Sequence, residues 1–170
     1  SADPLFLTLS TFDEEMRKQH LHPASRLVER QVMAASAEVA GRLDLRPGKP
    51  VIYIERLRLA NGHPVAHEIR YLAQALCPEF IHEDLESQSI HSLLVHKYHI
   101  PLVRALHTIE ARTLTASQAA LLQAQPGAPA FFVDRLTYTL NAGRELPAVW
   151  YQALYHGAEY TLRVEFEARR

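Results

Sequence analysis

The stretch from residue 51 to residue 72 constrains the fold of this chain more than any other. Two runs rich in apolar, β-branched and aromatic residues flank Asn61-Gly62, a dipeptide typical of a tight turn between antiparallel strands. The stretch is therefore predicted to form a β-hairpin. Arg56 and Arg58 are two residues apart on the first run, which places both side chains on one face of the strand, and Glu68 lies on the return run.

The register of this hairpin decides whether Glu68 meets the two arginines. A strict two-residue turn would place Glu68 opposite Glu55, on the other face. A type I turn with Gly62 in the left-handed bulge position would instead pair Ile54 with Glu68 and bring all three charges to one face. We favour the bulged register because it avoids two facing glutamates.

Charged side chains inside an otherwise apolar strand need a partner. One interpretation of Arg56, Arg58 and Glu68 is a structural ion pair, or arginines solvated on an exposed face. The other is an anion pocket, since guanidinium groups bind carboxylate or phosphate in a bidentate manner. In such a pocket Glu68 would accept hydrogen bonds from hydroxyl or amine groups of the ligand.

The composition excludes several classes of protein. The 170 residues suffice for one domain with a core, and a net charge of -1 argues against a free-standing nucleic-acid binder. No apolar run is long enough to span a membrane, and no signal segment opens the sequence. The single cysteine, Cys77, excludes an internal disulfide and fits a reducing, cytoplasmic location, where we expect it to be a buried small hydrophobe.

The ten histidines do not form a metal-binding pattern. No cysteine cluster and no HExxH motif is present, so we expect no metal site. The dinucleotide-binding, P-loop and nucleophile-elbow motifs are also missing, so we expect no cofactor and no nucleophilic hydrolase.

The rest of the pattern predicts an α+β fold, with a mainly antiparallel sheet and short helices packed on it. Besides the hairpin, strands are expected over residues 25–33, 103–114, 130–140, 147–155 and 160–168, and helices over 37–43, 89–98 and 116–123. A helix, a Pro-Gly turn and a hairpin occur at residues 36–72 and again at 115–155. This echo suggests two similar halves that share one sheet.

Several segments resemble the UTRA domain, the effector-binding domain of the HutC subfamily of GntR-type bacterial repressors. They are VAGRLDLRPGKPVIYIERLRLANGHPVAHE, SIHSLLVHKYHI and LYHGAEYTLRVEFEA, in the order that the family has them. The resemblance implies a chorismate-lyase-like fold, with residues 1–170 as one effector-binding and dimerisation domain. It also implies a homodimer that binds a small-molecule effector. DNA would be bound only through an N-terminal winged helix-turn-helix domain outside this chain.

The same resemblance implies roles for five residues. Arg56 and Arg58 would hold the anionic group of the effector, and Glu68 would hydrogen-bond its polar body. Ser92 stands at the position of the serine in the family's Ser-Leu-Tyr motif, and it would add a hydroxyl near a helix N-terminus. Tyr155 would close the pocket.

Two departures from the family pattern bear on the effector. Leu94 replaces the tyrosine of Ser-Leu-Tyr, and Val149, beside Trp150, stands where sugar-phosphate binders tend to carry an acidic residue. A more apolar wall is expected, which disfavours an amino-sugar phosphate and leaves room for an aromatic or aliphatic carboxylate, urocanate included.

Three functions remain open. The first is a non-enzymatic sensor domain of a transcriptional repressor, in which a bound metabolite changes operator affinity through the dimer. The second is a chorismate-lyase-like enzyme with the same fold. The third is a dimerisation module without a ligand.

Overall fold

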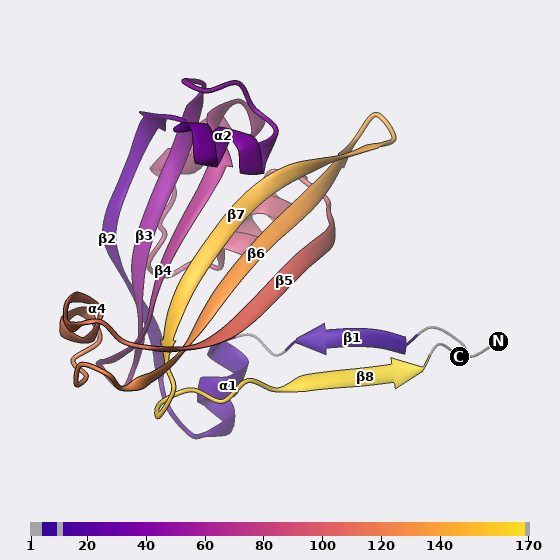
Figure 1. Ribbon diagram of the computed structural model, residues 1–170. Coiled ribbons are helices and arrows are strands. Elements are labelled where there is room, and N and C mark those ends of the chain that lie inside the picture. Colours follow the sequence, from indigo (N-terminus) through magenta and orange to yellow (C-terminus); the bar gives the residue numbers. More distant parts are fainter. Residues whose placement is uncertain (1–4, 10–11, 169–170) are drawn as a thin grey trace.

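An antiparallel sheet of six strands forms the body of the protein, in the order β2-β3-β4-β7-β6-β5 (Figure 1). The computed structural model describes residues 5–9 and 12–168. The strands are β2 (Pro23–Ala34), β3 (Pro50–Ala60), β4 (His63–Ala73), β5 (Leu102–Thr113), β6 (Pro129–Asn141) and β7 (Arg144–His156). The predicted α+β class with a mainly antiparallel sheet is confirmed.

The sheet consists of two similar halves, as the sequence echo predicts. Each half contains a strand, a short helix and a hairpin, in that order. The first half consists of β2, α2 (Ala37–Leu43) and the hairpin of β3 and β4, and the second consists of β5, α4 (Ala116–Leu121) and the hairpin of β6 and β7. The halves meet where β4 pairs with β7. The hydroxyls of Ser36 and Thr115 cap α2 and α4 by accepting hydrogen bonds from backbone N–H groups three residues ahead.

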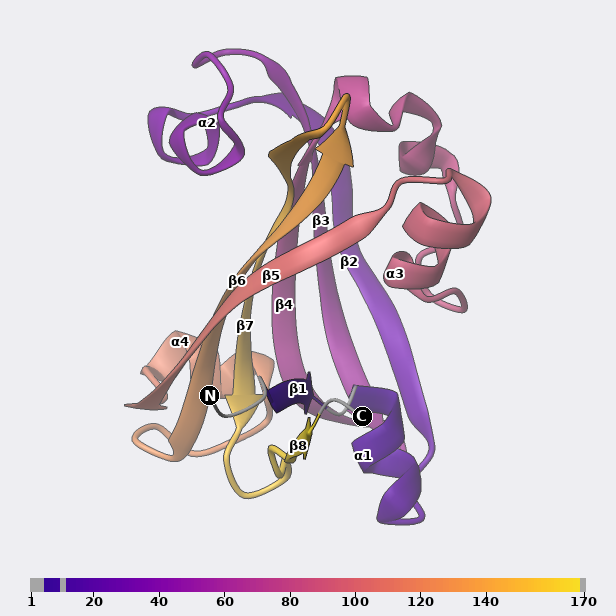
Figure 2. The same ribbon diagram turned by 90° about the vertical axis from the view of Figure 1, so that its right-hand side faces the viewer.

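Different elements cover the two faces of the sheet (Figure 2). Helices α2 and α4 pack on one face, against Val51 and Leu57 among others. The opposite face, called here the site face, carries the even-numbered β3 residues. Helix α1 (Phe12–Lys18) covers one end of the site face, and residues 74–101, called here the cover segment, cover the other.

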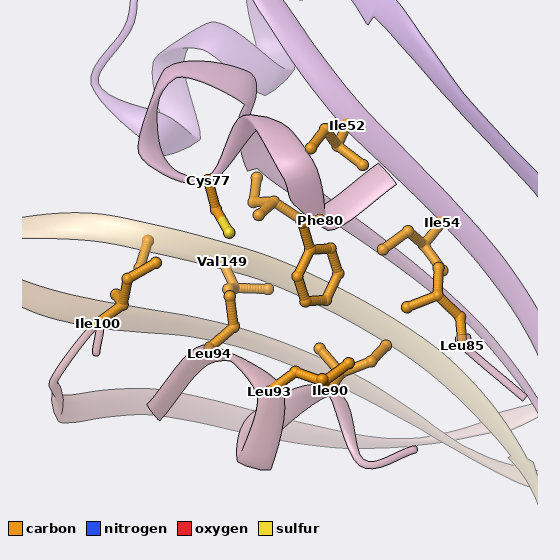
Figure 3. Close-up of a cluster of buried hydrophobic side chains, with 12 residues drawn as sticks. Ile52, Ile54, Cys77, Phe80, Leu85, Ile90, Leu93, Leu94, Ile100 and Val149 are labelled. Carbon is orange, nitrogen blue, oxygen red and sulfur yellow. The ribbon is translucent and has the colours of Figure 1, made fainter. Parts of the chain in front are cut away.

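The cover segment is held down by a cluster of buried apolar side chains (Figure 3). It contains the helical turns η1 (Gln74–Leu76), η2 (Pro78–His82), α3 (Ile90–Ser92) and η3 (Leu93–Lys97). The single helix predicted over residues 89–98 is thus α3 followed by a π-helical turn, η3. Phe80 and Leu94 lie at the centre of the cluster, and Cys77 is buried there as predicted.

The turn between β3 and β4 has two residues. Ala60 pairs with His63, and between them Asn61 and Gly62 have φ angles of 49° and 79°. Positive φ at both positions is the geometry of a type I′ turn, whose twist matches that of paired strands. The predicted type I turn with a bulge at Gly62 is therefore wrong.

The extra residue lies in β4 instead. A register shift leaves Val65 without a partner on β3, so that Arg56 pairs directly with Glu68. The predicted pairing of Ile54 with Glu68 is displaced by two residues along β3. Because a displacement of two residues preserves the face, the prediction that Arg56, Arg58 and Glu68 share a face is confirmed.

A separate two-stranded sheet projects from the body (Figure 1). It pairs β1 (Leu5–Leu9) with β8 (Val164–Ala168). The strand predicted over residues 160–168 is shorter than expected, because Tyr160 leaves the strand path and stacks on Phe12 of α1. Among residues 5–9 and 12–168, no helix combines the length and apolar character that crossing a membrane requires.

Replacing Gly62 with alanine should destabilise the fold by about 1 kcal/mol, because its φ of 79° disfavours a side chain. Gly41 is the matched control, since it lies inside α2 with open space around it. Gly41→Ala should stabilise the fold by about 0.5–1 kcal/mol. Urea denaturation measures both changes, and equal effects of the two substitutions would contradict the turn assignment.

Candidate anion-binding site

A buried cluster of charges occupies the middle of the site face. The Arg56 Nε donates to Glu68 Oε1 at 2.7 Å, and the Arg70 guanidinium also donates to Glu68 Oε1. Arg58 Nη1 lies 3.7 Å from Glu68 Oε2. Glu68 is only 1% exposed, so three guanidinium groups surround one carboxylate that water does not reach.

The cluster connects the sheet to both elements that cover the site face. Arg56 Nη1 donates to the backbone carbonyl of Leu85 in the cover segment at 2.9 Å. Arg58 Nη2 donates to Asp13 Oδ1 of α1 at 2.7 Å. The position of each cover is therefore linked to the side chain of one arginine.

Positive charge exceeds negative charge in this cluster. Three arginines face two carboxylates, those of Glu68 and Asp13. Two buried polar atoms of the cluster, Arg58 Nε and Glu68 Oε2, have no hydrogen-bond partner among the described residues. Buried polar groups are normally hydrogen-bonded, so this donor and this acceptor have hydrogen-bonding capacity that a polar ligand could use.

Burial and neighbouring charges act in opposite directions on the cluster. Burial raises the pKa of Glu68, but Arg70, Arg56 and Arg58 lower it by more, and the pKa is held well below its usual 4.5. Burial lowers the pKa of Arg56 despite the attraction of Glu68. Burial also lowers the pKa of Arg58, but Glu68 and Asp13 outweigh it and the net pKa is raised.

Two tyrosines of β7 border the cluster. The hydroxyls of Tyr151 and Tyr155 are 2.6 Å apart, and the guanidinium carbon of Arg70 lies 4.5 Å from the centre of the Tyr151 ring. Burial raises the pKa of Tyr151 to about 12 and raises that of Tyr155 well above 10, so both hydroxyls stay protonated and can donate. Tyr155 thus lies with Arg56, Arg58 and Glu68 on the site face.

Ser92 does not contact the cluster. Its side chain is exposed and its backbone N–H donates to Ser89 Oγ at 3.2 Å. Ser92 lines a hollow of about 380 Å³ on α3 and η3, together with Lys97 and four other residues. The structure therefore brings four of the five expected site residues together on one face, and the ligand-binding roles of all five stay predictions.

The apolar positions near the site divide between the two faces. Leu94 and Val149 are buried together in the cluster beneath the cover segment. Trp150 points to the opposite face, where it packs with α2 and its indole N–H donates to Asp134 Oδ2 at 3.2 Å. Trp150 therefore does not contribute to the apolar wall that the sequence predicts beside Val149.

Sequence reasoning missed Arg70, Asp13 and Tyr151. The signal for Arg70 is present in the sequence, because it lies two residues after Glu68 and must share its face. Asp13 reaches Arg58 only because α1 folds back over the sheet, and the sequence carries no comparable signal for that contact. No group of three or more metal-binding side chains occurs within the described ranges.

The fold of the chain has counterparts among known proteins. The UTRA domain family matches residues 18–161, and the chain belongs to this family. The chain is 31% identical over 153 residues to the HTH-type transcriptional repressor NagR of Bacillus subtilis (strain 168), a match to 90% of this chain and 61% of NagR. It is 28% identical over 162 residues to the histidine utilization repressor of Pseudomonas putida, a match to 95% of this chain and 62% of that protein.

The fold is also that of a solved relative. The crystal structure of PhnF from Mycobacterium smegmatis superposes with a TM-score of 0.79 at 25% identity, covering 91% of this chain and 67% of PhnF. The chain therefore spans about three fifths of the length of the curated relatives given above. These relatives are transcriptional repressors of the GntR family and HutC type, which confirms the resemblance drawn from the sequence.

Replacing Glu68 with glutamine should destabilise the fold by about 3–5 kcal/mol, because three buried arginines would lose their shared counter-ion. The matched control is Glu110→Gln, which breaks an exposed pair with Arg112 and should cost less than about 0.5 kcal/mol. Equilibrium denaturation measures both. Similar costs for the two substitutions would show that the cluster contributes little to stability.

The stability of the protein should fall as the pH drops below about 4.5. The pKa of Glu68 is lower in the folded chain than its usual 4.5, so its contribution is complete above that pH and is lost as the pH falls toward the folded-state pKa. Denaturation at pH 6, 5, 4 and 3 measures the slope. The Glu68→Gln variant should show a shallower slope over the same range, and an unchanged slope would contradict the assignment.

Proposed function

We propose that this chain is the effector-binding and dimerisation domain of a DNA-binding transcriptional repressor, and that a small anionic metabolite binds at the charged cluster of the site face. The observation that carries the proposal is the surplus of positive charge in the cluster, together with one atom of Arg58 and one of Glu68 that lack a hydrogen bond to any described residue. An anion bound there supplies the missing charge and uses the free hydrogen-bonding capacity.

The contacts suggest a division of labour between the two hairpin arginines. The side chain of Arg56 is 4% exposed, and its contacts go to Glu68 and the Leu85 carbonyl. The side chain of Arg58 is 13% exposed, and Asp13 is its main partner. Arg58 therefore binds the acidic group of the effector directly, while Arg56 orients Glu68 to receive a hydroxyl or amine of the same molecule.

The link between the site and DNA binding would pass through α1. An anion at Arg58 competes with Asp13, which holds α1 against the sheet. A ligand that loosens or reorients α1 has different affinities for two arrangements of the dimer, and this difference shifts their populations. In the full-length repressor an N-terminal winged helix-turn-helix domain would convert that shift into a change of operator affinity.

The names of the relatives favour a regulator over an enzyme. The curated relatives reported above are transcriptional repressors. A chorismate-lyase-like activity would appear as 4-hydroxybenzoate and pyruvate when the protein is incubated with chorismate. Turnover there would replace the sensor assignment with an enzymatic one.

The proposal predicts that anions stabilise the protein through Arg58. Thermal unfolding should be followed with urocanate, benzoate and glucose 6-phosphate. A bound anion at 100 times its dissociation constant should add about 2.7 kcal/mol, which corresponds to a rise in Tm of roughly 5–10 °C. Arg58→Gln should remove this rise.

The control variant is Arg112→Gln, which removes one exposed positive charge on β5. It should leave the rise in Tm unchanged. An equal loss in both variants would mean that general charge, rather than the cluster, attracts the anion. A rise that persists in Arg58→Gln would place the binding site elsewhere.

A further inference from the structure

The second half of the sheet repeats the arginine of the first. β3 and β6 each begin with a proline. Arg56 lies six residues after the proline of β3, and Arg135 lies six residues after the proline of β6. Arg135 pairs with Tyr151 across β6 and β7, and Tyr151 pairs with Arg70 across β7 and β4. Arg135 therefore lies on the site face, in one row with Arg70.

Arg135 lacks the carboxylate that its counterpart has. Arg56 is opposite Glu68, whereas Arg135 is opposite Tyr151, and its guanidinium carbon lies 4.3 Å from the centre of that ring. Among the described residues it forms no ion pair. The neighbouring Asp134 lies on the other face, where it accepts hydrogen bonds from the side chains of Trp150 and Gln152.

A histidine with two free ring nitrogens lies next to this arginine. His107 of β5 pairs with Arg135 across the sheet, and its Nδ1 and Nε2 are both buried without a hydrogen-bond partner in the part of the chain that the structure describes. Burial and the charge of Arg135 lower the pKa of His107 to about 4. The ring is therefore neutral near pH 7, with one N–H that can donate and one nitrogen that can accept.

The charge of Arg135 also acts on the cover segment. Burial and then Arg135 lower the pKa of His91 on α3. An unpaired guanidinium and an unpaired imidazole on the same face are the groups that bind a carboxylate or a phosphate.

We propose that Arg135 and His107 form a second anion-binding subsite, so that the effector carries two acidic groups, one bound at Arg58 and the other at Arg135. This inference rests on the proposed function and specifies the class of effector as a dicarboxylate or a similar dianion. β3 and β6 are separated by two strands, about 14 Å from backbone to backbone, and the row of Arg58 lies four residues from the row of Arg135, about 13 Å along the strands. Both arginine side chains can extend across part of this separation, so a flexible diacid of suitable length would connect the two guanidinium groups.

Matched pairs of acids test the second subsite. Succinate, adipate and suberate should be compared with butyrate, hexanoate and octanoate by isothermal titration of the wild-type chain. We expect one diacid to bind at least tenfold more tightly than the monoacid of equal length. Arg135→Gln should abolish this preference and leave the affinity for the monoacid within about twofold, while Arg58→Gln should weaken both acids.

Two further variants and a spectroscopic signal keep the result specific. Arg135→Lys preserves the charge and should retain part of the preference, and Arg112→Gln should retain all of it. In the wild type the diacid, unlike the monoacid, should shift the ¹⁵N resonances of the His107 ring, which a purely structural role for Arg135 would not explain.

The possible outcomes separate this inference from the proposed function. Equal binding of diacids and monoacids, or a preference that survives Arg135→Gln, overturns the second subsite while the function stands, provided that Arg58→Gln still weakens binding. An absence of binding by all six acids overturns the second subsite, and it overturns the proposed function as well if urocanate, benzoate and glucose 6-phosphate also leave the Tm unchanged. Binding that is insensitive to Arg58 but lost in Arg135→Gln overturns the proposed site and the two-ended effector with it.

Discussion

The pairing of Glu68 with three arginines is the interaction on which the rest of the structure depends. A buried carboxylate or guanidinium alone would be costly, but together they remain charged inside the fold. Through Arg56 the cluster holds the cover segment, and through Arg58 it holds α1. The same contacts leave more positive than negative charge on the site face. A stabilising network that is incomplete in this way is well suited to respond to an anion.

The internal repeat explains why the site is asymmetric. Both halves place an arginine at the same position of their first hairpin strand, but only the first half supplies a glutamate opposite it. In the second half Tyr151 stands there, and it lies against Arg70 as well as Arg135. One half of the sheet is thus internally neutralised to a large extent, and the other is left with an unpaired cation. This difference gives the site face two ends with distinct chemistry.

Much of the fold could be predicted from the sequence because its signals are local. Period-two apolar patterns define the strands, Ser36 and Thr115 mark the helix starts, and the two-residue spacing of Arg56 and Arg58 fixes their common face. The register of the hairpin could not be predicted, because it depends on Val65 taking an extra position in β4. The contact of Asp13 with Arg58 and the separation of Ser92 from the cluster depend on how α1 and the cover segment pack on the sheet. Those arrangements are set by tertiary contacts that no short pattern encodes.

The most direct test of the account is a crystal structure of this chain with an anion that raises its Tm. The account predicts an acidic group bound to the Arg58 guanidinium, within hydrogen-bond distance of Nε, and displacement of Asp13 from its present contact. Density for the anion in the hollow on α3 and η3, with Arg58 still bound to Asp13, would contradict it.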